Sequence, residues 1–130
     1  MHKSDEILDD MAQLTVEVIK YIELKRVPYA VKDQLIRAAS SIGANYSEAQ
    51  NASSKRDFIN KVYIAKKESG EAKYWLGIVE KLVGNGDEMT QLAKDVQGFS
   101  MMFQKIISTS KEKTGTRASR TDRALSISTR

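Results

Sequence analysis

Two glutamates three residues apart are the part of this sequence that comes nearest to a metal-binding or catalytic motif. Glu68 and Glu71 would project from one face of a helix, and a Glu-x-x-His pair on an inward face is the ligand unit of di-iron bundles. Neither glutamate has a histidine beside it, because the single histidine of the chain is His2, and there is no cysteine. Thiolate nucleophiles and zinc–thiolate sites are therefore excluded. We expect no metal, no cofactor and no enzyme activity.

Further polar residues accompany these glutamates on helices that are otherwise apolar. Asn45 and Glu48 stand one helical turn apart, and Arg37 precedes them on the same predicted helix. An arginine between carboxylates can satisfy their hydrogen bonds in a buried group. We expect a polar structural network that fixes the register of the helices or an interface, formed by Arg37, Asn45, Glu48, Glu68 and Glu71.

The net charge of +4 is unevenly distributed along the chain. Residues 113–130 hold five basic residues and one acidic residue, whereas residues 1–112 are balanced. Within that balance, residues 1–25 are acidic and residues 53–83 are basic. Clustered basic side chains attract phosphates in a strongly salt-dependent manner. The candidate nucleic-acid-binding residues are Lys55, Arg56, Lys61, Lys66, Lys67, Lys73, Arg117, Arg120 and Arg123.

Four helices are needed to position these side chains, and apolar periodicity places them at residues 5–25, 28–49, 55–83 and 87–111. The third has apolar or small residues alternating by four and three, which is typical of a bundle seam. These positions are Phe58, Val62, Ala65, Ser69, Ala72, Leu76, Val79 and Val83. The pattern predicts an all-α, antiparallel up-down four-helix bundle over residues 1–112, followed by a flexible basic tail over residues 113–130.

Local signals mark the ends of these helices. Pro28 suits the first turn of a helix, and the Ser54–Asp57 spacing is that of a capping box. The Gly84-Asn85-Gly86 run provides the residues that terminate a helix. Gly43 lies inside the second predicted helix, where glycine costs up to about 1 kcal/mol relative to alanine. We therefore expect close packing of another helix against it.

The third predicted helix carries a second apolar stripe away from its seam. The stripe consists of Tyr63, Tyr74, Trp75, Ile78 and Leu82, and two stripes on one helix indicate contacts on two sides. An exposed aromatic patch of this size is unusual on a monomer, so the first four of these residues are the predicted oligomer interface. The alternative is that the bundle simply buries a wide face of this helix.

No apolar run reaches the length of about 18 residues that a membrane span needs. The basic start of the chain is not followed by the apolar core of a signal peptide. We expect a cytoplasmic protein without a membrane partner.

Three stretches resemble the small four helix bundle protein family. They are residues 37–49 (RAASSIGANYSEA), 54–59 (SKRDFI) and 65–76 (AKKESGEAKYWL), and the resemblance extends over about residues 5–110. This family includes proteins encoded by intervening sequences in bacterial large-subunit ribosomal RNA genes. It also includes the accessory variability determinant proteins of diversity-generating retroelements.

The resemblance implies an antiparallel four-helix bundle that assembles as a ring-like homopentamer. For the retroelement branch it implies a reverse transcriptase and its template RNA as partners, and for the ribosomal branch the role is unassigned. Two functions remain open. The first is a non-catalytic homo-oligomeric scaffold that binds nucleic acid, RNA or DNA, and a reverse transcriptase. The second is an intervening-sequence-type bundle that acts as a protein-only adaptor.

Overall fold

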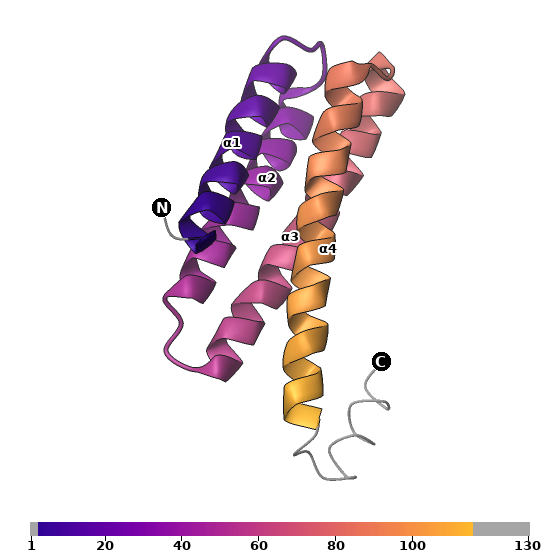
Figure 1. Ribbon diagram of the computed structural model, residues 1–130. Helices are drawn as coiled ribbons and strands as arrows, with labels where there is room; N and C mark the ends of the chain where they lie inside the picture. The colour runs from indigo at the N-terminus through magenta and orange to yellow at the C-terminus, as the bar shows by residue number, and fades with distance from the viewer. Residues whose placement is uncertain (1–2, 116–130) are drawn as a thin grey trace.

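Four antiparallel helices form the fold in a computed structural model that describes residues 3–115, with side chains described up to Lys111. The helices are α1 (Lys3–Glu23), α2 (Tyr29–Gln50), α3 (Lys55–Val83) and α4 (Asp87–Gly115). Successive helices run in opposite directions, and short connections join them (Figure 1). The prediction of an all-α four-helix bundle is confirmed, and the helix ends lie within four residues of the predicted positions.

The largest difference in helix length occurs at the end of α4. The helix was expected to end at Lys111 and continues to Gly115, three residues into the segment that was assigned to the tail. Lysine and glutamate are good helix formers, so the intervening KEK sequence gives the helix no reason to stop. Thr114 and Gly115 are the first residues after Lys111 with a low helix propensity, and glycine is the poorer helix former of the two.

Both ends of α3 form as the local sequence predicts. The Ser54 hydroxyl accepts a hydrogen bond from the Asp57 backbone N–H at 3.0 Å, and the Asp57 carboxylate accepts one from the Ser53 N–H at 3.2 Å. At the other end Gly84 has a φ of 89°, a left-handed conformation that favours glycine, and its N–H donates to the Glu80 carbonyl. The caps fix where α3 begins and ends.

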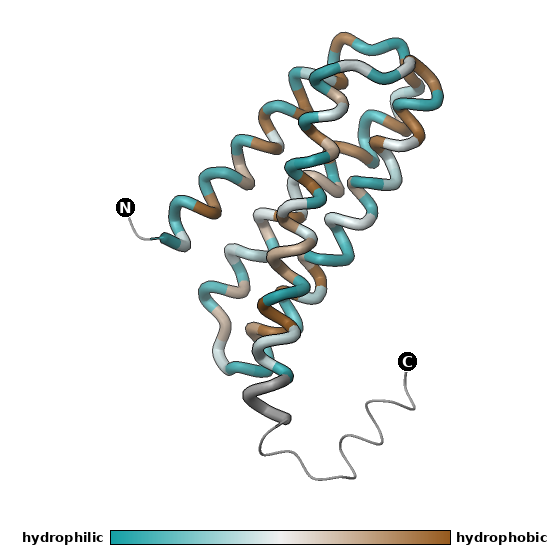
Figure 2. Tube along the Cα trace, turned by 45° about the vertical axis from the view of Figure 1, so that its right-hand side comes forward, coloured by the Kyte–Doolittle hydropathy of each residue, from teal (hydrophilic) through white to brown (hydrophobic). Residues whose placement is uncertain are grey.

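The core is one apolar cluster to which all four helices contribute. On α3 the six central positions of the predicted apolar repeat, from Val62 to Val79, are buried, while Phe58 is half-buried and Val83 is exposed. Apolar segments recur along every helix of the bundle (Figure 2). The largest fully buried side chains are Phe103, Met11, Leu14, Ile22, Leu35, Ile42, Leu76, Met89 and Ile107. This shared cluster fixes which face of each helix remains available for binding.

The helix pairs do not pack equally closely. A Cβ on Gly43 would lie 3.3 Å from the Met11 Cβ, and the Thr15 hydroxyl of α1 donates to the Ala39 carbonyl of α2 at 3.4 Å. Gly43 therefore has the close helix neighbour that its sequence position predicts. The pairs α2–α3 and α3–α4 also pack extensively, whereas α1 and α4 make the fewest contacts of the neighbouring pairs. The bundle is therefore most open between α1 and α4.

None of the helices in residues 3–115 has the combination of length and apolar character that crossing a membrane requires.

Candidate nucleic-acid interface

Two lysines of α3 lie along its contact with α4. The Lys73 ammonium donates to the Gln97 amide oxygen at 3.0 Å, and the Lys66 ammonium donates to the amide oxygen of Gln104. The lysines are seven residues apart, which places them about 10.5 Å apart along the helix axis. Their acceptors are neutral, so these hydrogen bonds orient both ammonium groups without cancelling their charge. We call Lys66, Lys73, Gln97 and Gln104 the basic seam.

A shallow groove adjoins the basic seam between α3 and α4. Its volume is about 470 Å³, and its lining includes Lys73, Lys94 and Gln97. Glu80 is the one carboxylate among the lining residues. A groove with two ammonium groups and one carboxylate is mildly cationic, which suits a phosphate backbone better than an anionic surface would.

The other predicted basic residues of α3 do not all join this seam. Lys61 faces α2, where its ammonium group lies 3.3 Å from the Glu48 carboxylate. Lys55 has the helical spacing of the basic seam, while Arg56 and Lys67 lie on the adjoining outer face, eleven residues apart. All three of these side chains are exposed. Arg117, Arg120 and Arg123 lie outside the described residues.

Tyrosines alternate with these outer cations along α3. Tyr63 and Tyr74 are 39% and 62% exposed, and by helical spacing they share the outer face of Arg56 and Lys67. The Lys111 ammonium of α4 lies 5.4 Å from the centre of the Tyr63 ring. The outer face therefore offers both aromatic rings and positive charge, a combination that periodicity alone did not reveal.

The remaining residues of the predicted oligomer interface are less exposed. Trp75 makes an edge-to-face contact with Tyr74 at 5.2 Å between ring centroids and packs against the core. Ile78 is half-buried. Exposed glycines are a feature that the sequence reasoning missed: a Cβ on Gly70 or Gly77 would meet nothing within 4 Å. Nothing in the described part of the chain requires glycine at these two positions.

The five residues of the predicted polar network are joined in smaller groups. The Asn45 amide donates to the Ser41 carbonyl of its own helix, and Glu48 pairs with Lys61. Arg37, Glu48 and Glu71 are exposed, so the expectation of a single buried network does not describe this geometry. The short reach of the asparagine side chain explains why its bond remains local.

Glu68 is the exception, because other members of the predicted network act on it. Partial burial raises the pKa of the Glu68 carboxyl above its usual value, and the Glu71 charge raises it further. The positive charges of Lys67 and Arg37 oppose this shift, while a hydrogen bond between the two carboxyl groups favours the protonated form. The two carboxylates of Glu68 and Glu71 therefore repel each other on α3 when both are charged. Among the described residues, no group of three or more acidic or histidine side chains is placed to hold a metal ion.

Comparison with known proteins gives the family. The model of the 23S rRNA-intervening sequence protein family matches residues 3–105, which include α1 to α3 and most of α4. This chain belongs to the 23S rRNA-intervening sequence protein family. The predicted resemblance to the four-helix family is thereby confirmed, and the match is to its ribosomal branch. Neither this match nor the structural one described next points specifically to the retroelement accessory proteins.

A solved structure supports the same assignment. A protein of unknown function from the S23 ribosomal protein family of Bacteroides thetaiotaomicron is similar to this member of the intervening-sequence family with a TM-score of 0.71 and 28% sequence identity. The similarity covers 78% of this chain and 97% of the other. No curated protein matched this sequence.

Proposed function

We propose that this intervening-sequence family protein is a non-catalytic scaffold that associates with copies of itself and binds RNA through the basic seam and the C-terminal arginines. The family description refers to 23S rRNA, and RNA is therefore the nucleic acid to test. RNA binding of this kind needs no reverse transcriptase. A reverse transcriptase partner, which the retroelement branch would imply, stays a prediction.

The observation that carries RNA binding is the pairing of Lys66 and Lys73 with glutamine amides. Most surface lysines lose part of their attraction for phosphate when a carboxylate lies beside them, as Lys61 does beside Glu48. The two seam lysines are held in place by Gln104 and Gln97 instead. Positive charge that is fixed and uncompensated favours sequence-independent contact with a phosphate backbone.

Self-association is supported by the outer face of α3. Gly70 and Gly77 are seven residues apart on this face, and each lowers helix stability by up to about 1 kcal/mol relative to alanine. Glycine on a helix surface permits close approach of another backbone. Tyr63 and Tyr74 flank the same surface, and tyrosine is enriched in protein interfaces. A second copy packed here would explain both the glycines and the exposed rings, and the family resemblance makes a ring of five copies the expected assembly.

Fluorescence anisotropy with a labelled single-stranded RNA tests the basic seam. We expect Lys66→Gln/Lys73→Gln to weaken binding and to reduce the slope of log K against log salt by about 1.4, because about 0.7 counterions are released for each single-strand phosphate neutralised. The matched control is Lys20→Gln/Lys81→Gln, which removes the same charge elsewhere on the bundle. Equal affinities for the two double variants, or no binding by the unmodified protein at low salt, would contradict RNA binding by the seam.

Truncation after Gly115 distinguishes the scaffold from a protein-only adaptor. The cut follows the last residue of α4 and leaves the four helices whole. We expect RNA affinity to fall while the oligomer mass changes only by the lost segments. Unchanged affinity in this variant would assign RNA binding to the bundle alone, and absent RNA binding in both forms would favour the adaptor.

A further inference from the structure

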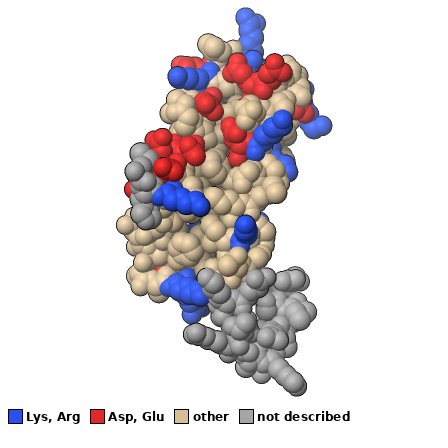
Figure 3. Space-filling model, in the orientation of Figure 1, with Lys and Arg blue, Asp and Glu red and all other residues tan. Residues whose placement is uncertain are grey.

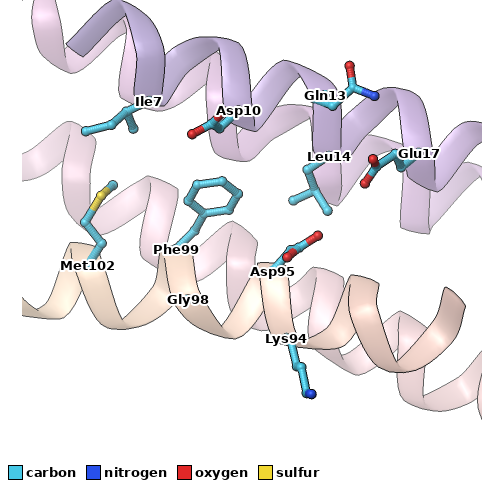
Figure 4. A pocket seen from close by; sticks show the side chains of 10 residues that line it. All are labelled: Ile7, Asp10, Gln13, Leu14, Glu17, Lys94, Asp95, Gly98, Phe99 and Met102. Atoms are coloured by element: carbon cyan, nitrogen blue, oxygen red, sulfur yellow. The ribbon is translucent and has the colours of Figure 1, made fainter. Parts of the chain in front are cut away.

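A second groove lies between α1 and α4, on the opposite side of α4 from the basic seam. It has a volume of about 510 Å³. Its apolar lining comes from Ile7 and Leu14 of α1 and from Phe99 and Met102 of α4 (Figure 4). Leu14 is buried while the other three side chains are half-buried. Apolar surface therefore remains accessible along the line where these two helices make few contacts.

Carboxylates border this apolar surface on both sides. Asp10 and Glu17 line it from α1, and Asp95 lines it from α4. In Figure 4 the Asp95 and Glu17 side chains extend into the space between the helices, whereas Lys94 points away from it. Acidic side chains also gather over the upper half of this face of the molecule (Figure 3). The groove thus combines an apolar floor with negative rims.

The chain itself contains a segment of complementary character. Residues 116–130 include four arginines and one aspartate. Arg123 and Arg130 flank Leu125 and Ile127, and Asp10 and Glu17 flank Leu14 on α1. Both stretches therefore place apolar side chains between like charges, with opposite signs in the two stretches.

The distance from the end of α4 to the groove is within the reach of this segment. From Gly115 back to Met102 the helix spans about 20 Å, and the groove continues along α4 to Lys94, about 12 Å further. Fifteen residues can extend over about 50 Å. A tether of this length also gives the segment an effective concentration in the millimolar range beside the groove.

We propose that the α1–α4 groove is the docking site of residues 116–130 of the same chain, with arginines against its acidic rims and Leu125 and Ile127 against its apolar floor. Docking holds these arginines on the acidic flank of α4, away from the basic seam on the other flank. If RNA binds as proposed above, the groove and the RNA compete for the same arginines, and the groove regulates RNA affinity.

Disulfide trapping tests the docking without any RNA. Because the sequence contains no native cysteine, only the two introduced thiols can form a disulfide. Ser126→Cys is combined with Gln13→Cys, which lines the groove, or with Ala44→Cys on α2, outside the groove. Both positions are exposed and helical, so they are matched sites. We expect the intrachain disulfide to form about tenfold faster with the Gln13→Cys partner because docking raises the local thiol concentration.

Charge variants of the groove provide the second measurement. Asp10→Asn/Glu17→Gln should slow trapping, and so should high salt, whereas Asp9→Asn/Glu23→Gln, two exposed α1 residues outside the groove, should leave the rate unchanged. Equal trapping at Gln13→Cys and Ala44→Cys overturns the proposal, and so does a trapping rate that neither charge pair changes. Predominant interchain disulfides overturn it in favour of a second copy as the source. RNA affinity should rise in Asp10→Asn/Glu17→Gln, and an unchanged affinity with efficient trapping would contradict only the competition.

Discussion

The backbone of Gly43 lies so close to α1 that a Cβ there would be 3.3 Å from the Cβ of Met11. We therefore expect Gly43→Val to separate the two helices and to lower the free energy of unfolding by about 1–3 kcal/mol, as overpacking of a filled core does. Urea denaturation of the variant gives this value. Gly98→Val is the control, because a Cβ on Gly98 meets nothing within 4 Å. Similar losses in both variants would mean that the close contact with Met11 does not set the cost.

The cap of α3 makes a second prediction. Ser54→Ala removes the acceptor of the Asp57 N–H and should lower the free energy of unfolding by about 1 kcal/mol. Ser53 contributes its backbone N–H to the same turn, so Ser53→Ala retains that hydrogen bond and serves as the control. Thermal unfolding followed by circular dichroism measures both. Equal melting temperatures for the two variants would show that the hydroxyl of Ser54 adds nothing to the cap.

Glu68 predicts a dependence of stability on pH. Because its pKa is raised in the folded protein, the fold binds this proton more tightly than the unfolded chain does. The free energy of unfolding therefore falls as the pH rises from the ordinary value of 4.5 through the raised pKa. We expect Glu68→Gln to be more stable than the unmodified protein at neutral pH, and the difference to disappear below pH 4.5.

Urea denaturation across this pH range checks the Glu68 prediction, with Glu23→Gln as an exposed control on α1. A lower stability of Glu68→Gln at neutral pH would contradict it. That result would mean that the attraction of Arg37 and Lys67 outweighs the desolvation and the repulsion from Glu71.

The sequence predicts features that depend on neighbouring residues and leaves open those that depend on packing register. Ser54 and Gly84 mark the ends of α3 because a cap is a local hydrogen-bond pattern. Gly43 indicates a close contact because an internal glycine costs stability. The partners of Lys66 and Lys73 could not be predicted, since periodicity gives the face of α3 but not the height at which Gln104 and Gln97 of α4 meet it.

The same limit applies to the acidic groove and to the predicted polar group. Asp10 and Asp95 border one groove only because α1 and α4 pack loosely, and no single-helix pattern contains that information. Arg37 and Glu68 belong to the predicted polar group, and the Arg37 charge acts on the Glu68 carboxyl. The exposure of Arg37 and the partial burial of Glu68 could not be predicted, because they depend on how far the helices stand from one another.

The exposed glycines of α3 make the last prediction. Gly70→Ala/Gly77→Ala adds two methyl groups where the described part of the chain leaves open space. In an isolated bundle this change should raise stability by up to about 1 kcal/mol per site through helix propensity. If a second copy packs closely against this face, the same methyl groups should weaken assembly.

We expect sedimentation to show the unmodified protein as an oligomer of the 14.6 kDa chain. The double variant should be shifted towards the monomer, and its monomer should be more stable to unfolding. A variant that keeps the full oligomer mass would place the interface elsewhere, and an unmodified protein that sediments as a single chain would contradict self-association.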